Sequence, residues 1–196
     1  MKIIASMVAG VWAAAGLAQA ASLTEVERQR LVAHFEMTAS WLEDETSHLS
    51  RAQLEYHPAP GRWSILEVLE HLRLAEPTYW QELRDALKEP PSGKKPPATD
   101  ADVLWYGIDR TVRQKTTPDK VPAHPPAGVQ APLEAFRKLH AEMLEYARTT
   151  QDDLRAHVLE KEGTDAYQWL LGISTHEQRH ILQIREIKAD RGFPKP

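Results

Sequence analysis

Hydrophobic positions recur at helical spacing in four long stretches of this chain, and polar residues fill the positions between them. The stretches run from Ser22 to about Leu49, from Ser64 to about Lys88, from about Pro132 to Thr149, and from about Asp165 to Ala189. Apolar residues three and four positions apart form one face of a helix, which is stable when it packs against other helices. The sequence shows neither strand-like alternation nor a glycine-rich phosphate loop. The pattern therefore predicts an all-α protein, a four-helix bundle.

Capping residues indicate where these helices begin. Ser22 and Thr24 each precede a glutamate by three positions, so either could open the first helix with a capping box. Ser64 and Glu67 form the same pattern ahead of the second helix. Pro77 lies inside that helix and is expected to kink or restart it, because proline removes a backbone donor and crowds the preceding turn.

A long proline-rich crossover, from Glu89 to Pro132, connects the second and third helices and contains nine of the fourteen prolines. Within it, the segment ADVLWYGIDRTVRQ is expected to form a short helix over Val103, Leu104, Trp105 and Ile108. A connection of this length is usually either a functional lid or disordered, and the aromatic residues favour a lid packed on the body. A second, polar connection leads to the fourth helix and is expected to hold a short helical piece around Leu154.

The first twenty residues have the pattern of a secretory signal. Lys2 precedes an apolar run from Ile3 to Leu17, and Ala18-Gln19-Ala20 follows as a cleavage site. The run is shorter than the roughly 20 apolar residues that a membrane-spanning helix needs. We therefore predict a signal peptide over residues 1–20 and one domain over residues 21–196. The protein is expected to be exported, periplasmic or secreted, with no stable membrane span after cleavage.

Composition limits the chemistry that this domain can perform. The 196 residues are 42% hydrophobic, which is enough for one sizeable core. The absence of cysteine excludes disulfides, thiolate ligands, thiol nucleophiles and a lipid anchor on cysteine. The formal net charge is −4 and no basic cluster stands out in the sequence, so nucleic acid is not an expected partner.

The fourth helix carries His176, Glu177 and His180 in the pattern H-E-x-x-H. Two histidines four positions apart lie on one face of a helix and can hold one metal ion. His71 lies in a similar apolar setting on the second helix, where it could supply a third imidazole. The alternative is that these are hydrogen-bonded core or surface histidines, since spacing alone does not distinguish the two.

A zinc-protease function fits the rest of the sequence poorly. The extended form of the protease motif needs glycine at position 183 and histidine at position 186, where this chain has Gln183 and Glu186. No strand is predicted before the helix to hold a peptide substrate. We therefore do not expect a protease.

Two segments give the chain a resemblance to the DinB-like (damage-inducible) superfamily of metal-binding four-helix bundles. They are HPAPGRWSILEVLEHLRLAE and WLLGISTHEQRHILQIREIK, and the resemblance covers about residues 23–190. In that family, one histidine on the second helix and an H-x-x-x-H pair on the fourth bind a divalent metal. The resemblance thus implies that His71, His176 and His180 are the metal ligands. The proline-rich crossover and the export signal are less typical of the family, which leaves the reaction open.

The resemblance implies an enzyme that acts on a small molecule through a divalent metal. Neutral imidazoles suit zinc or nickel best, with iron, manganese or copper as alternatives. The reaction would be either metal-dependent hydrolysis or a thiol-dependent transfer, and export favours hydrolysis because the thiols that such relatives use are mainly cytosolic. The candidate bases are Glu67, which also fits a capping role, and Glu177.

Other residues could approach such a site, and other functions remain open. His34 and His124 are further candidates, and Trp63, Trp105 and Tyr106 could line a pocket, although aromatic residues at helical spacing usually form core. The alternative functions are a non-catalytic metal-binding module and an interaction domain that forms a homodimer.

Overall fold

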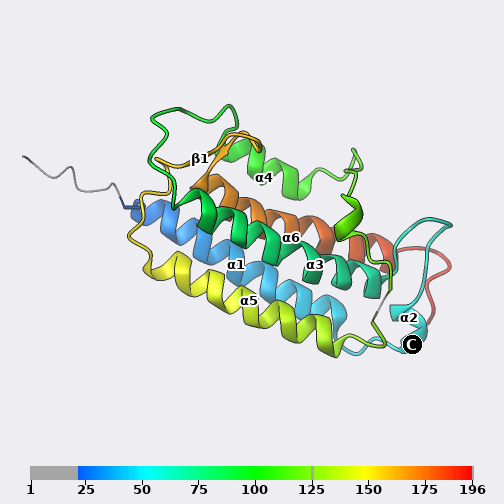
Figure 1. Cartoon of the computed structure of the whole chain (residues 1–196). Helices are drawn as coiled ribbons and strands as arrows, with labels where there is room; N and C mark the ends of the chain where they lie inside the picture. Colours follow the sequence, from blue (N-terminus) through cyan, green and yellow to red (C-terminus); the bar gives the residue numbers. More distant parts are fainter. Residues whose placement is uncertain (1–21, 125, 196) are drawn as a thin grey trace, which may run out of the picture.

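The chain folds into a bundle of long helices, seen in a computed structural model that describes residues 22–124 and 126–195 (Figure 1). The elements are α1 (Glu25–Thr46), α2 (Arg51–Leu54), α3 (Ile65–Ala86), α4 (Asp100–Ile108), the 3-10 helix η1 (Pro118–Lys120), α5 (Gln130–Thr149), strands β1 (Val158–Leu159) and β2 (Thr164–Asp165), and α6 (Ala166–Lys188). Helices α1, α3, α5 and α6 form the bundle, and the long crossover leads from α3 to α5. The predicted all-α class is confirmed.

Side-chain caps fix the starts of most helices where the sequence predicted them. Ser64 and Asp165 each form a full capping box at the start of α3 and α6. At α1 the cap is Thr24 and not Ser22, and the helix ends at Thr46, before the expected Leu49. The early end has a local cause, since Ser47 turns to extended backbone and His48 adopts a positive φ of 58°.

The expected restart at Pro77 does not occur, because α3 runs through this residue from Ile65 to Ala86. Pro77 lies on the exposed face of the helix. The carbonyl of Arg73, which loses its helical donor to the proline, also belongs to an exposed residue and can bond water instead.

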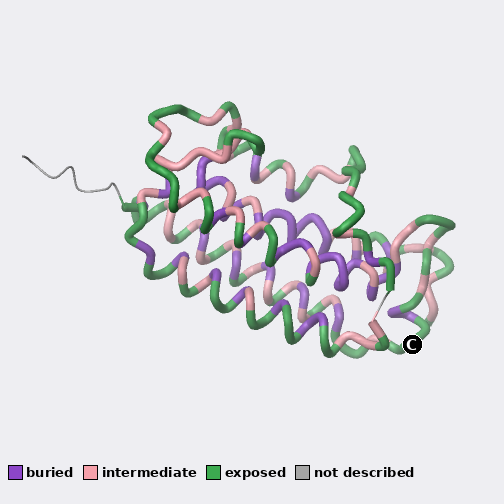
Figure 2. Tube along the Cα trace, in the orientation of Figure 1, coloured by how far each residue is buried: buried purple, intermediate pink, exposed green. Residues whose placement is uncertain are grey.

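Helix α6 is the central element of the bundle. Helices α1 and α3 flank it, α5 completes the bundle by packing on α1 and α3, and α4 covers the remaining side of α6. These neighbouring helices bury α6 on nearly every face, and Figure 2 shows it buried along most of its length. A helix enclosed in this way can carry a polar site inside the protein.

The bundle interior contains two apolar clusters separated by a polar layer. One cluster includes Phe35, Leu83 and Leu170, and the other includes Leu42, Leu69 and Ile184. Between them lie four buried polar residues, one from each long helix: Thr38, Glu76, His140 and Glu177. Burial of the two apolar clusters provides most of the driving force for folding. Burial of the polar layer costs free energy unless its side chains are hydrogen-bonded and its carboxyl groups are neutralised.

The crossover packs on the body, as its aromatic residues suggested, and its helix α4 lies against α6. Gly107 permits this close approach, because a Cβ there would lie 2.8 Å from Gln178 Oε1 and 2.9 Å from Thr175 Cβ. Val103 is buried as expected, whereas Trp105 and Ile108 are exposed. The aromatic content therefore predicted the packing of α4 but not which of its faces is buried.

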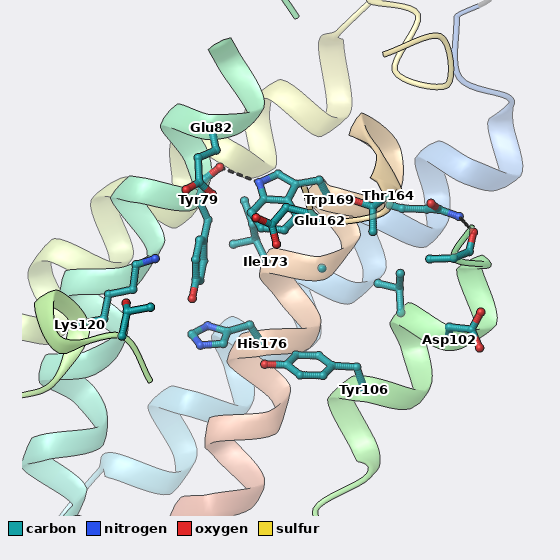
Figure 3. Close-up of a pocket in the computed structure, with 15 residues that line it drawn as sticks. Tyr79, Glu82, Asp102, Tyr106, Lys120, Glu162, Thr164, Trp169, Ile173 and His176 are labelled. Atoms are coloured by element: carbon teal, nitrogen blue, oxygen red, sulfur yellow. Dashed lines mark hydrogen bonds between the residues drawn. The ribbon is translucent and has the colours of Figure 1, made fainter. Parts of the chain in front are cut away.

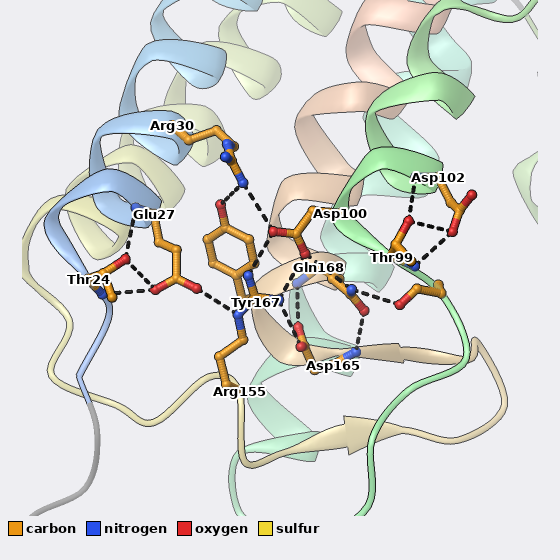
Figure 4. Close-up of polar contacts among 11 residues, drawn as sticks. Thr24, Glu27, Arg30, Thr99, Asp100, Asp102, Arg155, Asp165, Tyr167 and Gln168 are labelled. Carbon is orange, nitrogen blue, oxygen red and sulfur yellow. Dashed lines mark hydrogen bonds and ion pairs between the residues drawn. The ribbon is translucent and has the colours of Figure 1, made fainter.

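Ionic contacts anchor the N-terminal end of α4 to the bundle (Figure 4). Arg155 donates to both oxygens of Asp100 at 2.8–2.9 Å, to Asp165 at 2.9 Å and to Glu27 at 2.8 Å. This one guanidinium therefore joins the start of α4, the cap of α6 and the first turn of α1.

The short elements between the long helices differ from the sequence expectation. The segment around Leu154 forms turns, and a two-stranded antiparallel hairpin pairs Val158 with Asp165 and Leu159 with Thr164. Helix α2 was also not predicted. Both are too short for hydrophobic periodicity to reveal them.

None of the described helices has the length and apolar character needed to cross a membrane. The predicted signal peptide, residues 1–20, lies outside the described residues.

Candidate metal centre

Three histidines from two helices meet on the side of the bundle that the crossover covers. His71 comes from α3, and His176 and His180 come from successive turns of α6. His176 Nε2 lies 3.2 Å from His71 Nε2 and 3.1 Å from His180 Nε2. All three residues are less than a tenth exposed. The structure thus brings together the three histidines that the resemblance singled out, across 105 positions of sequence.

Neighbouring acceptors determine which nitrogens face one another. The Nδ1 of His71 lies 2.8 Å from the backbone carbonyl of Lys120, and the Nδ1 of His180 lies 3.0 Å from Gln183 Oε1. Carbonyl and amide oxygens are acceptors, so each Nδ1 carries the proton and donates it. The Nε2 atoms of His71 and His180 are then unprotonated, with their lone pairs directed at His176.

Burial keeps these imidazoles neutral. It is the largest cause that lowers the pKa of His71, and it lowers the pKa values of His176 and His180 well below the usual range. His71 also disfavours charge on His176 and His180, and His176 disfavours charge on His180. Neutral imidazole is the form that ligates metals.

The geometry of the three rings fits a divalent metal ion. With metal–nitrogen bonds of about 2.0–2.1 Å, nitrogens around a tetrahedral ion lie about 3.3 Å apart, close to the separations seen here. Without a cation, His176 Nε2 could donate to only one of its two neighbours, and two lone pairs would face each other in a buried place. The Nδ1 of His176 is itself buried without a partner. The donor set and its spacing therefore suit a metal.

No fourth carboxylate or histidine among the described residues joins this group. Structural zinc usually has four protein ligands, whereas three ligands leave positions for water or substrate. The arrangement therefore resembles that of a site open to a small molecule.

Two cavities reach the histidines. One has a volume of about 510 Å³ and the other about 490 Å³, and His176 lines both. Figure 3 shows the first cavity, in which the hydroxyl ends of Tyr79 and Tyr106 point towards His176. Burial raises the pKa of both tyrosines, so they are protonated at neutral pH and can donate hydrogen bonds.

The two candidate bases, Glu67 and Glu177, form hydrogen bonds away from the three histidines. Glu67 Oε2 accepts from the backbone nitrogen of Ser64 at 2.7 Å in the capping box, and it lies 3.4 Å from His57 Nδ1. Glu177 belongs to the polar layer, where it bonds Thr38 and lies 3.7 Å from His140 Nε2. Their role as bases stays a prediction, and the contacts that they make in the structure are structural ones.

The remaining candidates divide between the site and the rest of the fold. Trp63 lies over the centre, with its ring 4.9 Å from that of His71. Tyr106 lines both cavities, whereas Trp105 is exposed. His34 bonds Ser174 in the bundle, and His124 is exposed on the crossover.

Sequence reasoning missed three residues that shape the centre. Tyr79 lies two turns after His71 on α3, a spacing that could have indicated it. Lys120 contributes its backbone carbonyl from the last residue of η1, and no sequence pattern signals such a contact. Arg179 holds the crossover by donating to the carbonyls of Tyr106, Asp109 and Val112.

Comparison with known proteins identifies a family and a relative. Residues 23–184 match the family described as the DinB superfamily, which covers all four long helices nearly to the end of α6. The chain is also similar to YuaE, an uncharacterized protein of Bacillus subtilis (strain 168), with 28% identity over 149 residues. That alignment covers 74% of this chain and 89% of the relative. No solved structure gives a significant match.

Proposed function

This chain belongs to the DinB superfamily, and from that membership and the three converging histidines we propose that it is an exported metal-dependent enzyme acting on a small molecule. The observation that carries the proposal is the convergence of three imidazole Nε2 atoms beside two cavities. We favour hydrolysis over thiol-dependent transfer, because export directed by the signal-like segment at residues 1–20 would keep the protein away from cytosolic thiols.

His71, His176 and His180 would hold the ion through Nε2, and zinc or nickel is the proposed metal. The ion would supply Lewis acidity and a bound water of lowered pKa. The protein's own contribution is orientation, because the Lys120 carbonyl and Gln183 fix two of the imidazoles. Tyr79 and Tyr106 would donate hydrogen bonds to a substrate oxygen beside the centre.

Cobalt substitution tests whether the centre is open to ligands. We expect the cobalt-loaded protein to change its visible absorption when azide or acetohydroxamate is added, because a free position accepts these ions. The same sample would then be assayed with ester and amide substrates, and with thiol conjugation as the competing reaction. A spectrum insensitive to both ligands, with no turnover, would favour a non-catalytic metal-binding module instead.

Export is a separate part of the proposal and has its own test. The observation that supports it is the charged start, the apolar run to Leu17 and the Ala18-Gln19-Ala20 site. We expect protein recovered from the periplasm or medium to begin at Ala21 by mass spectrometry. Intact protein confined to the cytoplasm would contradict this part alone.

A further inference from the structure

We propose that the substrate is a small amphipathic anion, with an apolar group on one side of the centre and a carboxylate or phosphate on the other. This inference rests on the proposed function and adds the chemical class of the ligand. It comes from the difference in charge between the two cavities that meet at the histidines.

The second cavity is strongly basic. Six basic residues and no Asp or Glu are among the described residues that line it: Arg62, Arg110, Arg113, Lys115, Lys120 and Arg179. The whole chain carries a formal charge of −4, so this concentration is not a consequence of composition. A cleft lined by one sign of charge attracts ligands of the opposite sign.

Most of that positive charge is not neutralised by the protein. Arg62 and Arg110 share one carboxylate, that of Glu186, at 3.8 and 3.0 Å. The guanidinium of the buried residue Arg179 donates to backbone carbonyls, which carry no net charge. Arg113 and Lys115 are exposed and form no ion pair within the described residues. These last two side chains are therefore available for an anionic head group.

The first cavity has the opposite character. Tyr79, Tyr106, Trp169 and Ile173 line it, and these side chains suit an aromatic or branched apolar group (Figure 3). Three carboxylates, those of Glu82, Asp102 and Glu162, also line it. They disfavour an anion in this cavity, so the charges set the direction in which a ligand lies.

The two cavities share the residues beside the metal centre. Tyr79, Tyr106, Thr117, Lys120 and His176 line both of them. A ligand with its apolar end in one cavity and its anion in the other must therefore place its central atoms beside the histidines. Each cavity, at about 500 Å³, has the size of a small-molecule site.

Binding of dansyl-glycine tests this assignment, with dansyl-glycinamide as its uncharged counterpart and N-acetylglycine as a competitor without the aromatic group. We expect dansyl-glycine to bind at least about tenfold more tightly than either, and blue-shifted dansyl emission on binding. The preference over the amide should persist after the metal is removed, because the basic side chains and not the ion recognise the charge.

Paired variants identify the residues responsible. We expect R113Q/K115Q to weaken dansyl-glycine about tenfold and to leave dansyl-glycinamide unchanged. The matched control K95Q/K138Q removes the same charge from exposed sites outside both cavities and should bind like wild type. Circular dichroism would confirm that both variants fold.

Three results would overturn the inference: no binding of dansyl-glycine to wild type, equal affinity for acid and amide, or equal affinity of the two double variants. A preference present only with metal would mean that the carboxylate binds the ion, which also contradicts it. Metal content measured in the same samples distinguishes a failure of the proposed substrate class from a failure of the proposed function. Wild type that binds metal without an acid preference refutes only the substrate class, whereas wild type without metal refutes the proposed function.

Discussion

Two of the three histidines, His71 and His180, depend on a neighbour that holds the ring. Gln183 accepts from His180 Nδ1 and thereby directs Nε2 at the centre. We predict that Gln183→Ala weakens zinc affinity about 10- to 100-fold, the usual effect of removing such a partner. Gln183→Glu should restore most of it, because a carboxylate also accepts this proton.

Competition with a chromophoric chelator would measure these affinities. Gln29→Ala is a suitable control, because Gln29 is an amide on α1 that bonds Glu25 far from the centre. Unchanged affinity in Gln183→Ala would mean that packing alone orients His180.

The glutamate of the H-E-x-x-H sequence has a structural setting inside the bundle. Burial raises the pKa of Glu177 to about 8. Thr38 has one hydroxyl proton but two oxygen neighbours, the Phe35 carbonyl and Glu177 Oε2. A protonated Glu177 satisfies both contacts, because it donates to Thr38 while Thr38 donates to Phe35.

This setting predicts a stability change with a definite pH dependence. In the unfolded chain, Glu177 ionises above its usual pKa near 4.5. In the folded protein, it keeps its proton until about pH 8. Wild type therefore loses stability as pH rises between these values. We predict that Glu177→Gln is more stable than wild type at pH 8, by on the order of 2 kcal/mol, and gains little at pH 4.5.

Urea unfolding at the two pH values would measure this difference. Glu36→Gln provides the comparison, because Glu36 lies on the same helix as Thr38 but is exposed and paired with Arg148. If Glu177→Gln gained as much at pH 4.5 as at pH 8, protonation would not be the cause. Loss of activity in this variant would instead support the assignment of Glu177 as a base.

Among the elements, α4 and the segment after it depend on one buried side chain. Arg179 donates to the carbonyls of Tyr106 and Asp109 at the end of α4 and of Val112 beyond it. The Tyr106 carbonyl belongs to the last turn of α4, which lacks helical donors, and a cation there also suits the helix dipole. We predict that Arg179→Ala speeds amide hydrogen exchange over residues 104–116 and leaves α1 and α5 unchanged.

Hydrogen exchange with mass spectrometry would locate the effect. Arg137→Ala is the control, because Arg137 pairs with Glu43 on the far side of the bundle and does not touch the crossover. Exchange in α4 as slow as in wild type would mean that Gly107 packing and the Arg155 contacts are sufficient to hold it.

The sequence predicted the long helices because two local signals agreed within them. Hydrophobic periodicity indicated their faces, and the predicted capping residues Thr24 and Ser64 begin α1 and α3. It did not predict the hairpin at Val158, which is too short for periodicity, or the unbroken helix at Pro77, which depends on the exposure of one face. Contacts across the crossover depend on tertiary packing, which no local pattern encodes.

The candidate site was predictable in part. Spacing indicated His176 and His180, but only the family resemblance selected His71 from among the other histidines. The second cavity could not be predicted, since Arg113 and Lys115 reach it through an irregular segment. Their basic side chains are scattered along the sequence and come together only in the fold.

For the whole molecule, the two apolar clusters should hold the bundle without a metal. They contain residues of all four long helices, and the histidines lie to one side. We predict that metal-free protein keeps its helical circular dichroism and melts about 5–10 °C below the zinc-loaded form, as expected for a bound ligand.

A thermal melt with and without chelator would measure that shift. His180→Ala should show no response to chelator, because its centre lacks one ligand. Unfolding of wild type by chelator at 25 °C would instead identify the ion as a structural staple.

We propose that one ion is held jointly by α3 and α6, and zinc titration of metal-free protein is a direct test. Isothermal titration calorimetry should give one zinc per chain in wild type and in His57→Ala, whose histidine lies in the loop before α3. We predict that His71→Ala weakens this binding at least about 100-fold, because it removes one of three ligands. Equal zinc affinity in wild type and His71→Ala would contradict the account.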